Sequence, residues 1–214
     1  MDLSTLTKKI LDRRDGAGVL PIVQAGHPAL RRRSQDWAGQ LSDEVLAQLV
    51  ECMIVTMRDA PGVGLAAPQV GIPLRLAVME HDDPEDPLPL LTVLNPTYRA
   101  LDGERAYAWE GCLSMDGLRS IVPRATSVAF TCLVRDADGT LREHSADMHG
   151  WPARIVQHET DHLSGVLCHD EAVPRSLVYE EYVTRMPDLE SACKRLGLSG
   201  DVTRAAENGG VWVQ

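Results

Sequence analysis

Apolar residues recur at helical spacing in several segments of the chain. Residues 42–59 show this most clearly, because leucine, valine, isoleucine and methionine return every three or four positions. Ser42 is suited to cap the start of that helix. A shorter stripe predicts a helix over residues 3–13, and a third helix is predicted between Pro152, which a first turn tolerates, and Gly165, a natural stop.

The other apolar runs are short and bounded by turn residues, which is typical of strands. Asn95-Pro96 predicts the end of one strand, and Asp138-Gly139 predicts a hairpin turn between two others. In the polar C-terminal part we expect some helix within residues 176–196 and a loose segment at Asn208-Gly209-Gly210. The predicted strands are residues 74–79, 90–94, 104–109, 121–134 and 140–148.

Composition narrows the class of protein. The 214 residues suit one domain, and with 44% hydrophobic but only 4% aromatic residues its core must be aliphatic. A formal net charge of −10 argues against direct nucleic-acid or anionic-membrane binding, and no apolar run approaches the roughly 18 residues of a membrane span. Five scattered cysteines and a start without an apolar signal core predict a reducing, cytoplasmic setting.

The sequence Gln157-His158-Glu159-Thr160-Asp161-His162 contains an H-E-x-x-H motif. Residues four apart lie one turn above each other on a helix, so His158 and His162 can point at one metal ion. Glu159 lies beside the same face, where it can take a proton from water without being a ligand itself. The motif therefore predicts a metal site with an adjacent base.

Two further motifs carry candidate chemistry. Glu110-Gly111-Cys112-Leu113-Ser114 offers Cys112 as a thiolate ligand, and Gly62-Val63-Gly64-Leu65-Ala66-Ala67-Pro68-Gln69 offers the Gln69 amide as a donor. The second motif also matches the dinucleotide-binding pattern G-x-G-x-x-A. That pattern requires a strand before it and a full helix after it, whereas here a predicted helix precedes it and prolines follow, so we reject nucleotide binding.

Together the three motifs resemble the peptide deformylase family, in the family's order and at similar spacing. The resemblance covers roughly residues 20–170 and implies an α+β fold, with antiparallel β-sheets wrapped around a central helix that carries the H-E-x-x-H motif. It divides the chain into an N-terminal extension (1–20), a catalytic domain (21–170) and a partly helical C-terminal tail (171–214).

The resemblance also implies a ligand set and a reaction. Cys112, His158 and His162 would hold one divalent metal ion, usually Fe²⁺ in the family, with Zn²⁺, Ni²⁺ or Co²⁺ able to occupy the site. The reaction would be hydrolysis of the formyl group from the N-terminal formyl-methionine of newly made polypeptides, releasing formate.

Roles follow by position in the family's pattern. Glu159 would be the base, and the Gln69 amide and the Leu113 backbone N–H would donate to the formyl oxygen. Gly64 would bind the substrate backbone, and Val63, Trp151 and Ile155 would line the methionine pocket. A transient ribosome contact is expected in some relatives through a basic C-terminal helix, but here residues 170–214 hold eight acidic against five basic residues.

Some features leave alternatives open. Met115-Asp116 stands where the family commonly has an aliphatic residue and then proline, so the substrate-facing rim can differ. A metal-dependent peptidase is one alternative, because Cys168 follows His162 at the spacing of the third metzincin ligand. Another is a non-catalytic protein that binds formylated N-termini, although such a protein would have no chemical need for Glu159.

Overall fold

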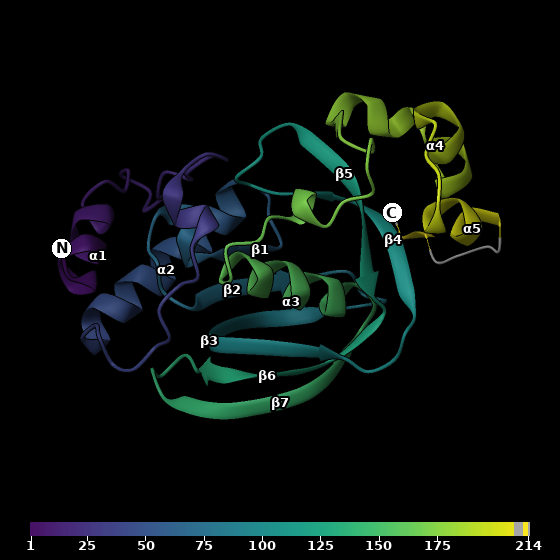
Figure 1. Cartoon of the computed structure of the whole chain (residues 1–214). Helices are drawn as coiled ribbons and strands as arrows, with labels where there is room; N and C mark the ends of the chain where they lie inside the picture. Colours follow the sequence, from purple (N-terminus) through teal and green to yellow (C-terminus); the bar gives the residue numbers. More distant parts are fainter. Residues whose placement is uncertain (208–211, 214) are drawn as a thin grey trace.

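Two β-sheets enclose one central helix in the computed structural model, which describes residues 1–207 and 212–213. Figure 1 shows this helix, α3 (Gly150–His162), above the strands β3, β6 and β7 and to the left of β4 and β5. The five-stranded sheet has the order β1 (Gly64–Ala66), β2 (Leu76–His81), β3 (Leu88–Ala100), β6 (Ser127–Arg135) and β7 (Leu141–His149). The other has the order β8 (Val178–Tyr179), β5 (Leu118–Ala125), β4 (Arg105–Gly111) and β9 (Trp212–Val213).

Neighbouring strands are antiparallel throughout the five-stranded sheet. In the second sheet β4 pairs with β5 and β5 with β8 in the antiparallel sense, whereas β9 runs parallel to β4. The predicted α+β class with antiparallel sheets around a central helix is thereby confirmed, with β9 as the one parallel partner among the described strands.

Helices α1 (Leu3–Leu11) and α2 (Asp43–Asp59) confirm the two predicted amphipathic helices. The Asp2 carboxylate accepts a hydrogen bond from the Thr5 N–H at 2.9 Å and so caps α1. Both helices bury their apolar stripes in a cluster that includes side chains from β1 and β2. This cluster contains Leu11, Leu49, Met53, Met57, Leu65 and Leu76.

Helix α3 is buried on most of its surface because both sheets pack on it. Ala153 and Val156 are fully buried in a second cluster with Phe130 of β6. The guanidinium of the buried Arg75 donates to the Leu163 carbonyl at 3.3 Å, just beyond the C-terminal end of the helix. Helix α3, which carries the two histidines, is therefore held by packing along its length and by the Arg75 hydrogen bond just beyond its C-terminal end.

The structure corrects the predicted strand over residues 121–134. This run is two strands, β5 and β6, that meet at Thr126 and belong to different sheets. The Thr126 N–H donates to the Glu104 carbonyl at 3.1 Å where the chain crosses from one sheet to the other. A largely apolar run indicates that both segments are buried, but not that the chain changes sheets.

The predicted end of a strand at Asn95-Pro96 is also wrong, because β3 continues to Ala100. Asn95 instead has a positive φ of 51°, and the pairing of β3 with β6 shifts between Leu94 and Thr97. The Asn95 side chain accepts from the Trp37 N–H at 2.6 Å and donates to the Trp37 carbonyl at 3.0 Å. These bonds stabilise a bulge where the sequence suggests an end.

The hairpin and the C-terminal helices agree better with the sequence. Residues 136–140 connect β6 to β7, with Gly139 at φ 90°. Helix α4 (Leu189–Leu196) confirms helix within residues 176–196, and α5 (Asp201–Glu207) follows it. The segment Asn208-Gly209-Gly210 lies outside the described residues, and within those residues no helix has the length and apolar character needed to cross a bilayer.

Replacing Gly165 by alanine should destabilise the protein by about 2 kcal/mol or more. Gly165 has φ 80°, and an added Cβ would lie 2.8 Å from the backbone carbonyl carbon of Arg31. The left-handed conformation alone costs roughly 1–2 kcal/mol for an L-residue, and backbone atoms cannot move aside cheaply. Urea unfolding monitored by circular dichroism measures the loss.

Gly16→Ala is the matched control for this experiment. Gly16 has no atom within 4 Å of an added Cβ and no positive φ, so its substitution should change the free energy of unfolding by less than about 0.5 kcal/mol. Equal effects at the two glycines would contradict the role given to Gly165.

Candidate metal centre

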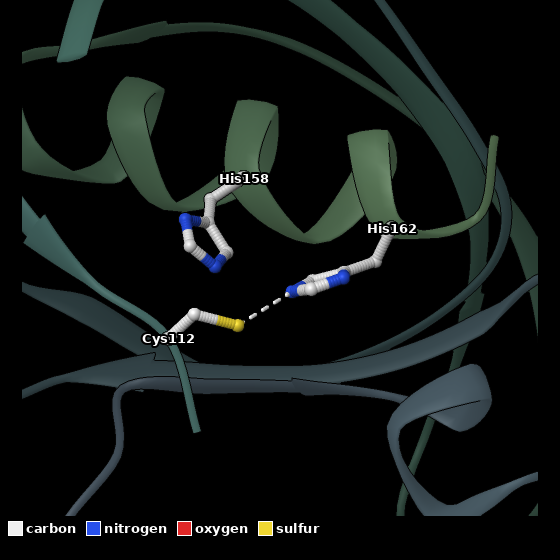
Figure 2. A group of neighbouring side chains, drawn as sticks. All are labelled: Cys112, His158 and His162. Atoms are coloured by element: carbon white, nitrogen blue, oxygen red, sulfur yellow. Dashed lines mark hydrogen bonds between the residues drawn. The ribbon is translucent and has the colours of Figure 1, made fainter. Parts of the chain in front are cut away.

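Three potential metal ligands converge between α3 and the end of β4. The thiol and imidazole atoms of Cys112, His158 and His162 lie within 4.8 Å of one another (Figure 2). The two histidines lie one turn apart on α3, with ring centroids 5.0 Å apart, and Cys112 directly follows β4. The Cys112 Sγ is 3.3 Å from the His162 Nε2. The fold thus brings together the three residues predicted to be ligands.

This donor set fits a divalent metal ion. One thiolate and two imidazoles bind zinc-like ions at about 2.0–2.3 Å, so ligand atoms a few ångströms apart can share an ion, and three protein ligands leave a position open. Burial lowers the pKa of His162 well below its ordinary value, which keeps the ring in the neutral form that a ligand requires. Close by, the buried Glu159 Oε2 has no hydrogen-bond partner among the described residues.

Glu159 faces the backbone of β1. The carboxylate is 4% exposed, and a Cβ at Gly64 would lie only 2.3 Å from its Oε1. Only glycine therefore fits at position 64 with Glu159 in this place. Burial raises the pKa of Glu159 to about 7.

Gln69 lies in the short 3₁₀ helix η2 (Ala67–Val70) and is 1% exposed. Its Oε1 accepts a hydrogen bond from the Ala66 N–H at 2.8 Å, so its amide nitrogen faces the Cys112 Sγ at 3.6 Å. The same segment excludes the dinucleotide-binding interpretation, because a three-residue strand and one 3₁₀ turn replace the strand and long helix that such a site requires.

A buried ion network around Glu110 holds His158 in place, although the sequence predicted no role for Glu110. The Glu110 carboxylate is 3.0 Å from the His158 Nδ1 and forms ion pairs with Arg124 at 2.9 Å and Arg154 at 2.5 Å. Arg124 also pairs with Asp161, which lies on α3 three residues after His158. Burial alone would raise the pKa of Glu110, but Arg124 and His158 hold it well below its usual value, so the carboxylate is charged.

One signal in the sequence could have pointed to this network. Arg154 precedes His158 by four residues, so both lie on one face of α3. A charged residue on the inward face of a helix requires a partner. That the partner is Glu110, two residues before Cys112 on β4, is evident only from the fold.

A cavity of about 700 Å³ opens onto the centre. Residues from each of the three motifs and from α3 line it, among them all the residues predicted to act on substrate. Trp151 is placed there by a hydrogen bond from its backbone N–H to Asp86 at 2.7 Å, and Leu113 by its carbonyl, which accepts from Gln24 at 3.1 Å. The predicted residues in the lining are Val63, Gly64, Gln69, Cys112, Leu113, Trp151, Ile155, His158 and Glu159.

Cys168, the third ligand in the peptidase alternative, lies on the other side of His158. It is buried. Among the described residues, its Sγ lies within 4.8 Å of ligand atoms of Glu110 and His158, but it forms no such cluster with His162. Burial raises the pKa of Cys168 to about 12, which disfavours the thiolate. The geometry therefore favours Cys112 as the third ligand.

Comparison with known proteins identifies the family. The model of the family described as polypeptide deformylase matches residues 19–177. Peptide deformylase 1 of Bifidobacterium longum is 45% identical over 193 residues, which cover 85% of this chain and 87% of that protein. The chain belongs to the polypeptide deformylase family.

Solved structures of deformylases agree with this assignment. A Met-Ala-Ser-bound class I type b peptide deformylase from Acinetobacter baumannii is 33% identical with a TM-score of 0.64, covering 72% of this chain and 98% of that one. A peptide deformylase from Synechococcus elongatus in complex with actinonin is 29% identical with a TM-score of 0.63, covering 88% and 92%. The chain is thus a member of a family of metal-dependent hydrolases, and the metzincin-like alternative is wrong.

Separate alanine substitutions of the two cysteines should distinguish their roles. Cys112→Ala removes a proposed ligand, so metal affinity should fall by more than about 100-fold, beyond the 10–100-fold typical for losing a supporting residue. Cys168→Ala should leave the metal content of the purified protein close to one equivalent. Elemental analysis after anaerobic loading measures both, and loss of metal from the Cys168 variant alone would reverse the assignment.

Glu110→Gln should lower both stability and metal affinity. The substitution leaves two buried guanidinium groups without their shared carboxylate, which typically costs about 3–5 kcal/mol. The loss of the charged partner of His158 should also weaken metal binding by about 10–100-fold. Chemical denaturation and metal competition with a chelator measure the two effects, and Glu104→Gln, an exposed site near the start of the same strand, is the control.

Proposed function

We propose that this protein removes the formyl group from the N-terminal formyl-methionine of newly made polypeptides, releasing formate and a free amine. The observation that carries the proposal is the grouping of a buried carboxylate and a buried amide around the three-ligand centre. Glu159 and Gln69 both line the cavity beside Cys112, and family membership supports the same chemistry.

We propose Cys112, His158 and His162 as ligands of one divalent ion, with Fe²⁺ as the working metal and Zn²⁺, Ni²⁺ or Co²⁺ as possible occupants. When bound, such an ion acts as a Lewis acid and lowers the pKa of a water molecule. The single thiolate makes the centre softer than three histidines would, which suits these metals better than Mg²⁺ or Ca²⁺.

Glu159 is the proposed general base. Its carboxylate accepts a proton from the attacking water, and the same group then returns the proton to the leaving amine of methionine. Its close packing against Gly64 fixes the carboxylate, because the group cannot move toward β1. Since the Oε2 has no other partner among the described residues, this oxygen is free to accept the proton.

Gln69 and Leu113 are the proposed donors to the formyl oxygen. The Gln69 carbonyl oxygen is occupied by the Ala66 N–H, so the amide orientation is fixed and its N–H groups point toward the centre. A preoriented donor stabilises negative charge that develops on the oxygen as water attacks. The backbone N–H of Leu113, next to Cys112, is the proposed second donor.

The rest of the cavity binds the substrate in this proposal. Val63, Trp151 and Ile155 form an apolar part of the lining that suits the methionine side chain. Gly64, at the start of β1, is proposed to hydrogen-bond the substrate backbone. The catalytic unit is taken as residues 21–170, with residues 1–20 and 171–214 as extensions.

Partners and location remain part of the proposal. Formyl-methionyl nascent peptides are the expected partners, with at most a transient ribosome contact, because the C-terminal tail is acidic overall. All five cysteines are free and buried, which supports a reducing compartment such as the cytoplasm.

Glu159→Gln should retain metal and lose turnover. The amide fills the same space beside Gly64 but cannot accept the proton, so kcat for formyl-Met-Ala-Ser should fall by about 10²–10⁴-fold. Formate release from anaerobically purified, metal-loaded protein measures this effect, with Glu143→Gln on the exposed face of β7 as control. Metal-replete wild-type protein that releases no formate would instead favour a protein that only binds formylated N-termini.

A further inference from the structure

One part of the cavity wall carries charged side chains that are not buried. Asp116, Arg119 and Glu180 all line it. The Arg119 guanidinium donates to the Glu180 Oε1 at 2.8 Å, whereas Asp116 forms no ion pair with any other residue that the structure describes. One uncompensated carboxylate therefore faces the cavity.

These three residues lie at the mouth of the cavity rather than at its floor. Glu159 and Gln69 are almost fully buried, while Asp116 is exposed, as is the side chain of Glu180. A peptide whose formyl end reaches the floor must leave through the exposed side, because the chain continues beyond its first residue. The residues that follow formyl-methionine therefore pass the charged rim.

The backbone at Asp116 is fixed by the N-terminal segment. The Asp116 N–H donates to the Gln24 Oε1 at 3.3 Å, and the Gln24 amide donates to the Leu113 carbonyl at 3.1 Å. The next residue, Gly117, accepts a hydrogen bond from the Glu180 N–H at 2.9 Å. Asp116 is thus presented on a loop held from both sides, which lowers the entropy lost when it binds a partner.

Arg119 does not neutralise Asp116. Its guanidinium lies against the backbone of Gly111, where an added Cβ would be 1.9 Å away, and its charge is paired with Glu180. The rim consequently carries one net negative charge, within a protein of formal net charge −10. A cationic side chain would find a complementary partner there, and an acidic one would be repelled.

We propose that Asp116 is a specificity-determining residue that selects peptides with lysine or arginine in the two positions after formyl-methionine. This inference rests on the proposed function and extends it to the choice of substrate. The carboxylate binds the side-chain ammonium or guanidinium at the mouth while the formyl group lies at the centre.

The test compares peptides that differ only in one charge. Formyl-Met-Lys-Ser and formyl-Met-Ala-Lys, with amidated C-termini, are each paired with the same peptide carrying acetyl-lysine. The ratio of kcat/KM for the lysine peptide to that of its acetylated partner should be about three to five for the wild type, as expected for one solvent-accessible ion pair. In Asp116→Asn the ratio should approach one, and in Asp116→Lys it should fall below one.

Glu181→Gln is the matched control, because Glu181 is exposed and adjacent to Glu180 but does not line the cavity. This variant makes the same change in net charge and should keep the wild-type ratio. A ratio that is the same in the wild type and in Asp116→Asn overturns the proposal. An equal fall in Asp116→Asn and Glu181→Gln also overturns it, since the general acidity of the surface would then explain the preference.

Failure of the proposed function would be visible separately. Formate release from formyl-Met-Ala-Ser by the wild type tests the activity itself. If no formate is released, the same ratio is obtained from the Kd values of Met-Lys-Ser and its acetyl-lysine form. If Asp116→Asn brings the Kd ratio to one, Asp116 selects cationic peptides even though the protein does not release formate. If Asp116→Asn leaves the Kd ratio unchanged, the role proposed for Asp116 is wrong.

Discussion

The buried carboxylate of Glu110 is the interaction on which the arrangement of the site depends. A charge removed from water must be paired, and Glu110 meets this requirement with Arg124 from β5, Arg154 from α3 and the ring of His158. The network therefore joins the second sheet to the central helix. It also orients one of the proposed ligands, so packing of the fold and geometry of the centre follow from the same contacts.

The ion network continues along the same face of α3, from His158 to Asp161 three residues further on. Arg124 bridges Glu110 and Asp161, and the Tyr98 hydroxyl donates to Asp161 at 2.8 Å. Tyr98 belongs to β3 of the five-stranded sheet, so a chain of polar contacts runs from one sheet to the other across α3. A helix buried on both sides is thereby fixed in rotation as well as in position. Rotation of α3 would break the contacts of Arg154 and His158 with Glu110 and the contact of Asp161 with Arg124.

Local periodicity was sufficient to predict α1 and α2, because each has one apolar stripe and a side chain that caps its first turn. It failed where the decisive contact is remote. The change of sheets at Thr126 depends on which strands β5 and β6 meet, and the bulge at Asn95 depends on the Trp37 backbone. Both are tertiary facts that a window of neighbouring residues does not contain.

The residues of the proposed site divide in a similar way. Five of these residues occur in short motifs whose residue types indicate their chemistry, and the fold brings them together. They are Cys112, His158, His162, Glu159 and Gln69. Glu110 stands inside one of those motifs, but its partners Arg124 and Arg154 lie on other elements. The contact of Glu159 with Gly64 was equally hidden, since the glycine suggested close approach to a ligand, whereas a side chain of the protein occupies that space.

The floor and the mouth of the cavity are under different physical constraints. At the floor, the residues are in close contact with one another: Gly64 lies against the Glu159 side chain, and Glu110 is paired with Arg154. A substitution at Gly64 or Glu110 therefore disturbs its neighbours as well. At the mouth, Asp116 is exposed and held only through its backbone, so the fold tolerates other side chains there. Glu180 lies beyond residue 177, where the family match ends, yet it completes the same rim. Substitutions at the mouth can therefore change which peptides the cavity accepts, while the groups proposed to carry out hydrolysis stay in place.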